Sequence, residues 1–199
     1  MLRVLSKWYL FFISIALTIT SFCVIVFVKT TPNLEERISF VIGAFDADSA
    51  GLNRFLNEKK PSSVKEINYR FNALETSNFN YILVSLIRAD SDFFILPFSY
   101  FDSNKDSSVK YAATIDENYV EEKVNQDFIY YSDGEYLKGI KIYDSTTNEG
   151  LFKDYITYTR EENKSDYYLF FTFNSHNIGT LNDSKTENVF SFLKEIFAA

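Results

Sequence analysis

Cysteine and histidine are almost missing from this sequence, which holds one of each, Cys23 and His176. Because Cys23 lies inside a long apolar run, we expect neither a disulfide nor a cysteine nucleophile elsewhere in the chain. A metal site needs several converging His, Cys or carboxylate ligands, and none can be assigned around His176. Ser175 precedes His176, but no nucleophile-elbow pattern surrounds the pair. The sequence therefore predicts no catalytic residue, no metal and no cofactor, and we expect a protein that is not an enzyme.

Glycine and proline are also scarce, at six and three residues. The glycines do not form the G-x-G-x-x-G or G-x-x-x-x-G-K patterns that cradle phosphate groups, which excludes the common nucleotide-binding loops. Asp46 to Gly51 does match the first half of a calcium loop, D-x-D-x-x-G. The later ligand positions, however, hold Ala50 and Asn57 in place of an oxygen ligand and a bidentate glutamate. We therefore expect these aspartates to cap a helix.

Basic side chains are outnumbered by acidic ones, 20 against 27, which gives a formal net charge of −7. Three of the basic residues lie within the first 29 positions, so the remainder of the chain is more acidic still. Nucleic-acid phosphates and anionic lipid headgroups both require a basic face. The charge balance therefore excludes nucleic acid as a partner and excludes a domain that lies flat on an anionic membrane.

A long apolar run is the most prominent feature that the sequence does contain. Trp8 to Val28 is a stretch of 21 residues without a charge, and about 20 apolar residues suffice for a helix to cross a bilayer. Arg3 and Lys7 precede the run, so the positive-inside rule places the N-terminus in the cytoplasm. We expect a single-pass cell-membrane anchor, with residues 30–199 extracytoplasmic.

Two alternatives to a retained anchor stay open. A cleaved signal peptide has a shorter apolar core, of about 7 to 15 residues, and a small-residue cleavage site that is not seen here. A lipoprotein would be acylated at Cys23, but the bulky Phe22 occupies the preceding position, which usually holds a small residue. The predicted organisation is thus an anchor or signal at 1–29, a polar tether at 30–37, and one domain at 38–199.

The first part of that domain alternates between strand and helix patterns. Apolar runs predict the strands and apolar residues at helical spacing predict the helices. The expected elements are strand 38–45, helix 49–60, strand 64–71, helix 77–89 and strand 92–96. The last of these, DFFIL, is apolar on both faces, which is typical of parallel strands covered by helices on each side. The sequence therefore predicts an α/β fold, a three-layer α-β-α lobe with a mainly parallel sheet.

The second part of the domain is less regular. Its patterns predict a strand at 111–115, a helix at 117–124, a hairpin of strands 127–131 and 137–143, a strand at 167–173, a polar loop at 175–184 and a closing helix at 187–197. The hairpin turn is expected at Ser132-Asp133-Gly134. Leu151 to Tyr158 fits either a helix or a strand.

Two strand ends carry residues suited to ligand binding. In open α/β sheets, ligands bind beyond the carboxyl ends of the strands, where the strand order reverses. Aromatic faces with a few hydroxyl and carboxylate groups suit a sugar or another small polar solute. The candidate ligand-binding residues are Phe45 and Asp46 after the first strand, and Pro97, Ser99 and Tyr100 after the third. The alternative is that the rings after the third strand only cover the hydrophobic core.

Several segments resemble the first lobe of extracellular solute-binding proteins of Gram-positive bacteria. The resemblance is carried by ISFVIGAFDADSAGLNRFL (38–56), SDFFILPFSYF (91–101), YAATIDENYVEE (111–122) and NSHNIGTLND (174–183). It implies a periplasmic-binding-protein-like lobe behind a membrane anchor. Members of that family have two lobes that close on the ligand, whereas this chain has room for one, so it would be a truncated or single-lobe relative.

The resemblance implies non-catalytic recognition of a small polar solute, with a sugar among the candidates. It also implies a membrane transporter or a cell-surface complex as a partner. Two other functions stay open. The first is a cell-surface interaction or accessory protein of a membrane complex that binds no small molecule, and the second is an anchored hydrolase.

Overall fold

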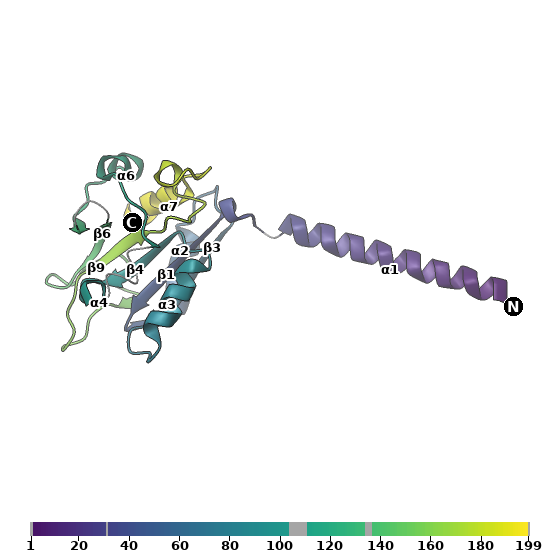
Figure 1. The fold of residues 1–199 in the computed structure, drawn as a ribbon, viewed down its shortest axis with the longest axis horizontal. Helices are drawn as coiled ribbons and strands as arrows, with labels where there is room; N and C mark the ends of the chain where they lie inside the picture. The colour runs from purple at the N-terminus through teal and green to yellow at the C-terminus, as the bar shows by residue number, and fades with distance from the viewer. Residues whose placement is uncertain (1, 31, 104–110, 134–136, 199) are drawn as a thin grey trace. The chain divides into compact units, whose positions relative to one another are not determined.

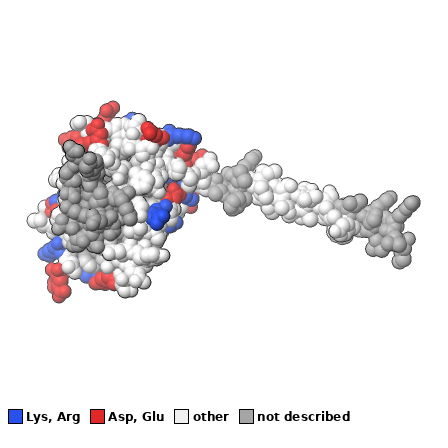
Figure 2. All heavy atoms as spheres, viewed as in Figure 1, with Lys and Arg blue, Asp and Glu red and all other residues white. Residues whose placement is uncertain are grey.

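The computed structural model describes residues 2–30, 32–103, 111–133 and 137–198. The chain divides into two compact units, Met1–Asn33 and Leu34–Ala199. The first unit is the helix α1 (Leu2–Thr30), which contains the predicted anchor (Figure 1). The side chains described along α1 carry no charge (Figure 2). Within the described residues, no helix combines the length and the apolar character that crossing a bilayer requires.

The first half of the second unit alternates strands and helices, and this prediction is confirmed. The elements are η1 (Leu34–Glu36), β1 (Arg37–Ala44), α2 (Ser49–Glu58), β3 (Glu66–Ala73), α3 (Phe79–Arg88) and β4 (Phe93–Pro97). Strand β1 pairs in parallel with β3 on one side and with β4 on the other. Phe40 of β1, for example, lies opposite Tyr69 of β3 and Phe93 of β4. The parallel part of the predicted sheet is therefore present in these three strands.

Of the two aspartates expected to cap a helix after β1, only Asp48 does so. Asp48 is the N-cap of α2, and its Oδ1 accepts hydrogen bonds from the backbone N–H groups of Ala50, at 3.2 Å, and Gly51, at 3.0 Å. These two bonds satisfy backbone donors that a helix start leaves unpaired. Asp46 instead belongs to a two-residue strand, β2 (Asp46–Ala47), that pairs with β8 (Ile156–Thr157).

The second half of the unit extends the sheet with antiparallel strands. Its further elements are α4 (Phe98–Ser103), α6 (Glu117–Val124), β5 (Tyr130–Asp133), β6 (Leu137–Asp144), β7 (Glu149–Gly150), β9 (Tyr167–Phe171), η3 (Gly179–Leu181) and α7 (Asn188–Phe197). The main strand order is β3-β1-β4-β9-β6-β5, and β7 pairs with β6. Strand β9 runs antiparallel to both β4 and β6. The sheet is thus parallel at one end and antiparallel at the other.

Most of the elements predicted for the second half are found. The helix at 117–124, the strand from Tyr167 and the closing helix are confirmed. The predicted hairpin is present as the antiparallel pair of β5 and β6. Its turn was expected at Ser132-Asp133-Gly134, but Ser132 and Asp133 are paired residues of β5, and Gly134 lies outside the described residues. The strand predicted at 111–115 is wrong, because the described part of that segment forms only an isolated bridge between Ala112 and Thr172. Its buried residues Ala113 and Ile115 close the core beyond β9 instead of extending the sheet.

Helices cover both faces of the sheet, which gives the mixed α/β fold three layers (Figure 1). Helix α3 packs on one face, and α2, α6 and α7 pack on the other. All five residues of β4 are buried. Phe93 and Ile95 join the core cluster beneath α2 and α7, whereas Phe94 joins the cluster beneath α3. The prediction that this strand is buried on both faces is confirmed.

A buried polar cluster fastens the amino-terminal edge of the sheet. The Asp92 carboxylate accepts hydrogen bonds from Ser175 Oγ at 2.6 Å, from Asn177 Nδ2 at 3.1 Å and from the backbone N–H of Ser39 at 2.8 Å. Asn177 Nδ2 also donates to the backbone carbonyl oxygen of Arg37 at 2.9 Å. Burial raises the pKa of Asp92, although the three hydrogen bonds oppose that rise. This cluster joins the start of β1, the start of β4 and the loop before α7.

Replacing Asp92 with asparagine tests the importance of this cluster. Each partner of the carboxylate is a donor, so the amide N–H₂ of Asp92→Asn would face another donor inside the protein. We expect the free energy of unfolding to fall by about 2 kcal/mol, measured by urea denaturation of the full chain. The control is Asp90→Asn, which removes a partly exposed ion pair with Arg37 and should lower it by less than about 1 kcal/mol. Equal effects of the two variants would contradict this assignment.

Candidate functional site

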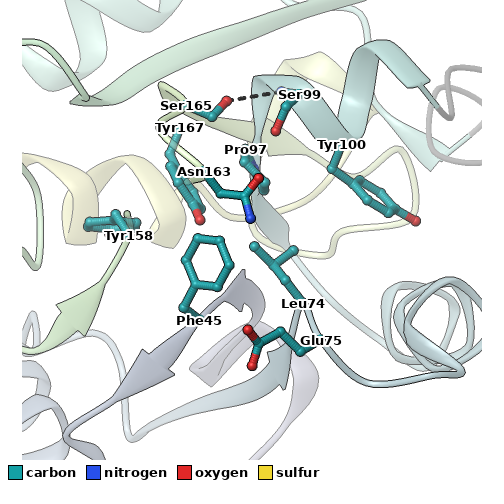
Figure 3. A pocket seen from close by; sticks show the side chains of 10 residues that line it. All are labelled: Phe45, Leu74, Glu75, Pro97, Ser99, Tyr100, Tyr158, Asn163, Ser165 and Tyr167. Atoms are coloured by element: carbon teal, nitrogen blue, oxygen red, sulfur yellow. Dashed lines mark hydrogen bonds between the residues drawn. The ribbon is translucent and has the colours of Figure 1, made fainter. Parts of the chain in front are cut away.

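A cavity of about 320 Å³ opens at the carboxyl ends of the parallel strands (Figure 3). Three strands contribute to it, because Phe45 follows β1, Leu74 follows β3, and Pro97 ends β4. The antiparallel strand β9 begins at the same edge with Tyr167. The residues that line the cavity are Phe45, Leu74, Glu75, Pro97, Ser99, Tyr100, Tyr158, Asn163, Ser165 and Tyr167.

The strand order explains why a cavity forms at this place. From β1 the chain crosses by α2 to β3 on one side, and then returns by α3 to β4 on the other side. The two connecting helices lie on opposite faces of the sheet. After β4 the chain enters α4, whose Tyr100 packs on the same face as α3. The chain thus leaves the adjacent strands β1 and β4 toward opposite faces of the sheet, and a crevice remains between their ends. Such crevices are where α/β sheets bind ligands.

Four of the five predicted site residues lie together at this cavity. Phe45, Pro97, Ser99 and Tyr100 all line it, although they come from two strand ends more than fifty positions apart. Asp46 does not line it. Its carboxylate is exposed and accepts a hydrogen bond from the backbone N–H of the next residue, Ala47, at 2.8 Å.

Six lining residues were not predicted. Leu74 and Glu75 follow the second parallel strand, so the strand-end argument could have found them if it had been applied to all three strands. The other four come from the segment that enters β9, and they are Tyr158, Asn163, Ser165 and Tyr167. No local pattern in the sequence identifies them, because it is the pairing of β9 with β4 that brings them to the cavity.

Tyr167 supplies the most informative atom of the site. The residue has no exposed surface, and its hydroxyl has no hydrogen-bond partner within the described residues. In Figure 3 this hydroxyl points into the cavity, beside the ring of Phe45 and the amide of Asn163. Burial raises the pKa of Tyr167 well above its ordinary value, so the hydroxyl keeps its proton. A buried polar group without a partner is unfavourable, and because this hydroxyl has no accessible surface, a ligand in the cavity can hydrogen-bond to it only when a neighbouring lining side chain shifts.

Tyr158 lies beside Tyr167, with 4.6 Å between the ring centroids, but its hydroxyl has a partner. That hydroxyl donates to the backbone carbonyl oxygen of Leu151 at 2.7 Å. Burial raises the pKa of Tyr158 as well, and the neighbouring tyrosines add to the effect. The two tyrosines are therefore chemically matched and equally enclosed, and they differ in whether the fold satisfies the hydroxyl.

Tyr100 has a double role at the cavity wall. Its ring lines the cavity and also packs edge-on against Phe79 of α3, with 4.8 Å between the centroids. Its hydroxyl points away from the other lining residues in Figure 3 and hydrogen-bonds to Asn80. Burial raises the pKa of Tyr100 to about 12. The side chain thus offers the cavity an aromatic face, while its hydroxyl joins α4 to α3.

The segment between β8 and β9 forms one wall and is fastened at its end. Ser165 Oγ accepts a hydrogen bond from the backbone N–H of Ser99 at 3.0 Å. The next residue, Asp166, forms an ion pair with Lys141 at 2.7 Å and accepts a hydrogen bond from the hydroxyl of Ser145 at 2.8 Å. Partial burial opposes ionisation of Asp166, but these donors outweigh it and lower the pKa of the carboxyl group. The wall is therefore held by contacts with both α4 and β6.

Substituting phenylalanine for each of the two enclosed tyrosines tests the state of their hydroxyl groups. Tyr167→Phe removes a hydroxyl without a partner, so without ligand we expect an unchanged or higher free energy of unfolding, by up to about 1 kcal/mol. Tyr158→Phe removes a bonded hydroxyl and should lower it by about 1 kcal/mol. Urea denaturation of both variants measures the difference. A loss for Tyr167→Phe equal to that of Tyr158→Phe would show that the Tyr167 hydroxyl has a partner in the protein.

Comparison with known protein families, with curated proteins and with solved structures finds no match for this chain. The resemblance to solute-binding proteins therefore rests on the short sequence motifs alone. The molecule itself adds a cavity with aromatic faces, uncharged polar groups and one carboxylate, Glu75. The described lining thus combines aromatic rings with hydrogen-bonding groups, and Glu75 is its one carboxylate residue.

Proposed function

We propose that this protein is a membrane-anchored, extracytoplasmic binding module that recognises a small polar solute without catalysis. The binding site is the cavity at the ends of β1, β3 and β4, in a single lobe of the solute-binding-protein type. The observation that carries the proposal is the Tyr167 hydroxyl, which is fully enclosed, lies at the cavity and lacks a partner within the described residues.

The chemistry of the lining supports a polar ligand with some apolar surface. The rings of Phe45 and Tyr100, which are partly exposed, give flat faces on which C–H groups of a solute can pack. Hydrogen-bonding atoms converge on the same space from Asn163 and Tyr167. Small-molecule sites usually have apolar and aromatic walls with a small number of polar groups.

The size of the cavity supports a small ligand. Small-molecule sites span roughly 300 to 1,000 Å³, and this cavity, at about 320 Å³, lies at the lower end. A sugar monomer or a solute of similar size would therefore suit it better than an oligomer. The walls come from separate segments that are joined by hydrogen bonds, such as the one between Ser99 and Ser165.

The proposed anchor is supported by the sequence. The charge-free run Trp8 to Val28 follows Arg3 and Lys7, and its large apolar side chains, including Phe11 and Phe22, are exposed along α1. A bilayer would cover this apolar surface. Since no described helix meets the structural requirement for spanning, the anchor and its orientation are proposed from the residue pattern alone.

Ligand-dependent melting of the full chain in detergent tests solute recognition. We expect one or more members of a panel of sugars, polyols and amino-acid amides to raise the melting temperature of the wild-type protein. A ligand at 100 times its dissociation constant stabilises by about 2.7 kcal/mol. Tyr167→Phe should lose most of this increase, whereas Tyr158→Phe should retain it, because the hydroxyl of Tyr158 is bonded to Leu151. If no compound raises the melting temperature and a partner protein is recovered by cross-linking, the accessory-protein alternative is favoured.

Reporter fusions test the anchor and its orientation. Alkaline phosphatase joined after Ala199 should be active in a bacterial host, because the enzyme folds only outside the cytoplasm, and the fusion should stay with membranes after alkaline extraction. Replacing Leu17 and Ile19 with arginine should release the fusion from membranes, since each charge at a helix centre disfavours insertion by about 3 kcal/mol. The control exchanges are Leu17→Val and Ile19→Val. An inactive fusion, or one that alkaline extraction removes, would contradict the proposal.

A further inference from the structure

Two opposite charges meet at the rim of the cavity. Glu75 lines the cavity and forms an ion pair with Arg160, which lies in the segment between β8 and β9. The Arg160 guanidinium also lies over the ring of Phe45, at 5.1 Å from its centroid. The two charged side chains are about half exposed, at 47% and 59% for Arg160 and Glu75. The pair therefore connects the turn after β3 to the opposite wall, across the ring at the end of β1.

The position of Arg160 is fixed by the wall from which it comes. The backbone N–H of Asn163 donates to the carbonyl oxygen of Arg160 at 2.9 Å, and the Arg160 N–H donates in return at 3.4 Å. These bonds close a tight turn whose last residue, Asn163, itself lines the cavity. The guanidinium consequently lies near the lining and near Phe45. A change of its ion-pair partner would therefore alter the charge at the cavity.

The other polar groups of the lining carry no charge. Asn163, Ser99 and Ser165 are neutral, and burial keeps Tyr100 and Tyr167 protonated at neutral pH. Beneath the wall, Lys141 is paired with both Asp144 and Asp166, so its charge is matched there. Glu75 is thus the one charged residue of the described lining, and Arg160 compensates its charge.

We infer that Glu75 and Arg160 are specificity-determining residues that make this cavity select an uncharged solute rich in hydroxyl or amide groups. The inference rests on the proposed binding function and adds the charge class of the ligand and the residues that set it. An anionic solute would be attracted by Arg160 but repelled by Glu75 at the lining, and a cationic solute would meet the reverse. A neutral solute meets neither repulsion and leaves the ion pair intact.

Removing one member of the pair should change the selectivity in a stated direction. Glu75→Gln leaves Arg160 without its carboxylate partner and should favour an anionic ligand. Arg160→Gln leaves the Glu75 carboxylate uncompensated at the lining and should favour a cationic ligand. Because the site is partly exposed, we expect each gain in affinity to be about three- to fivefold. The matched controls are Glu149→Gln and Lys153→Gln, which change the net charge equally by breaking an ion pair that does not line this cavity.

The test uses two sets of probes that differ in charge and share a skeleton. The first set is glucose, glucuronate and glucosamine, and the second is N-acetylglycinamide, N-acetylglycine and glycinamide. Binding of each compound to the full chain in detergent is measured by calorimetry and by melting temperature. The wild-type protein and both controls should prefer the uncharged member of a set. Glu75→Gln should gain affinity for the anionic member, and Arg160→Gln for the cationic one.

The outcomes separate this inference from the function on which it rests. The role of Glu75 and Arg160 is overturned if the wild-type protein binds a charged member more tightly than the neutral one. It is also overturned if the affinities of the rim variants and of the controls change equally. In both cases solute binding itself remains supported. If no compound of either set binds the wild type or any variant, the proposed function falls and the charge assignment falls with it.

Discussion

Strand β4 carries five consecutive buried residues, so each face of the sheet must be covered along its length. Helix α3 covers one face, and α2 and α7 cover the other. To place α2 and α3 on opposite faces, the chain leaves β1 and β3 toward different sides of the sheet. The cavity at the ends of these strands is thus a geometric consequence of how the core is buried, and its walls are added by neighbouring segments.

Two buried polar groups of the domain, Asp92 and Tyr167, differ in their hydrogen bonding. Asp92, at the amino-terminal edge of the sheet, receives three hydrogen bonds and joins three segments. Tyr167, at the carboxyl edge, is equally enclosed and receives none within the described residues. Since unsatisfied buried groups are unfavourable, this unpaired hydroxyl is the observation on which the proposed ligand site rests. Ser175, which precedes His176, also has a partner inside the protein, because its hydroxyl donates to the Asp92 carboxylate.

Local patterns were sufficient for the first half of the fold and for part of the site. Apolar runs, helical spacing and the Asp48 cap are properties of neighbouring residues, so β1, α2, β3, α3 and β4 could be predicted, whereas the short strand β2 was not. The antiparallel half depends on pairing between distant strands, which leaves no local signal, and so Asn163 and Tyr167 were missed. Asp46 was predicted beside Phe45, but the chain bends at Phe45 and Asp46 enters the short strand β2, so only Phe45 lines the cavity.

The buried asparagine near the start of β1 has a consequence for access to the cavity. Asn177 holds the backbone carbonyl groups of Leu34 and Arg37, so the chain enters the domain at the amino-terminal end of β1. The cavity opens at the other end of that strand, eight residues away, which is roughly 25 Å at about 3.3 Å per residue. Within the domain, the first residues and the cavity therefore lie at opposite ends of β1.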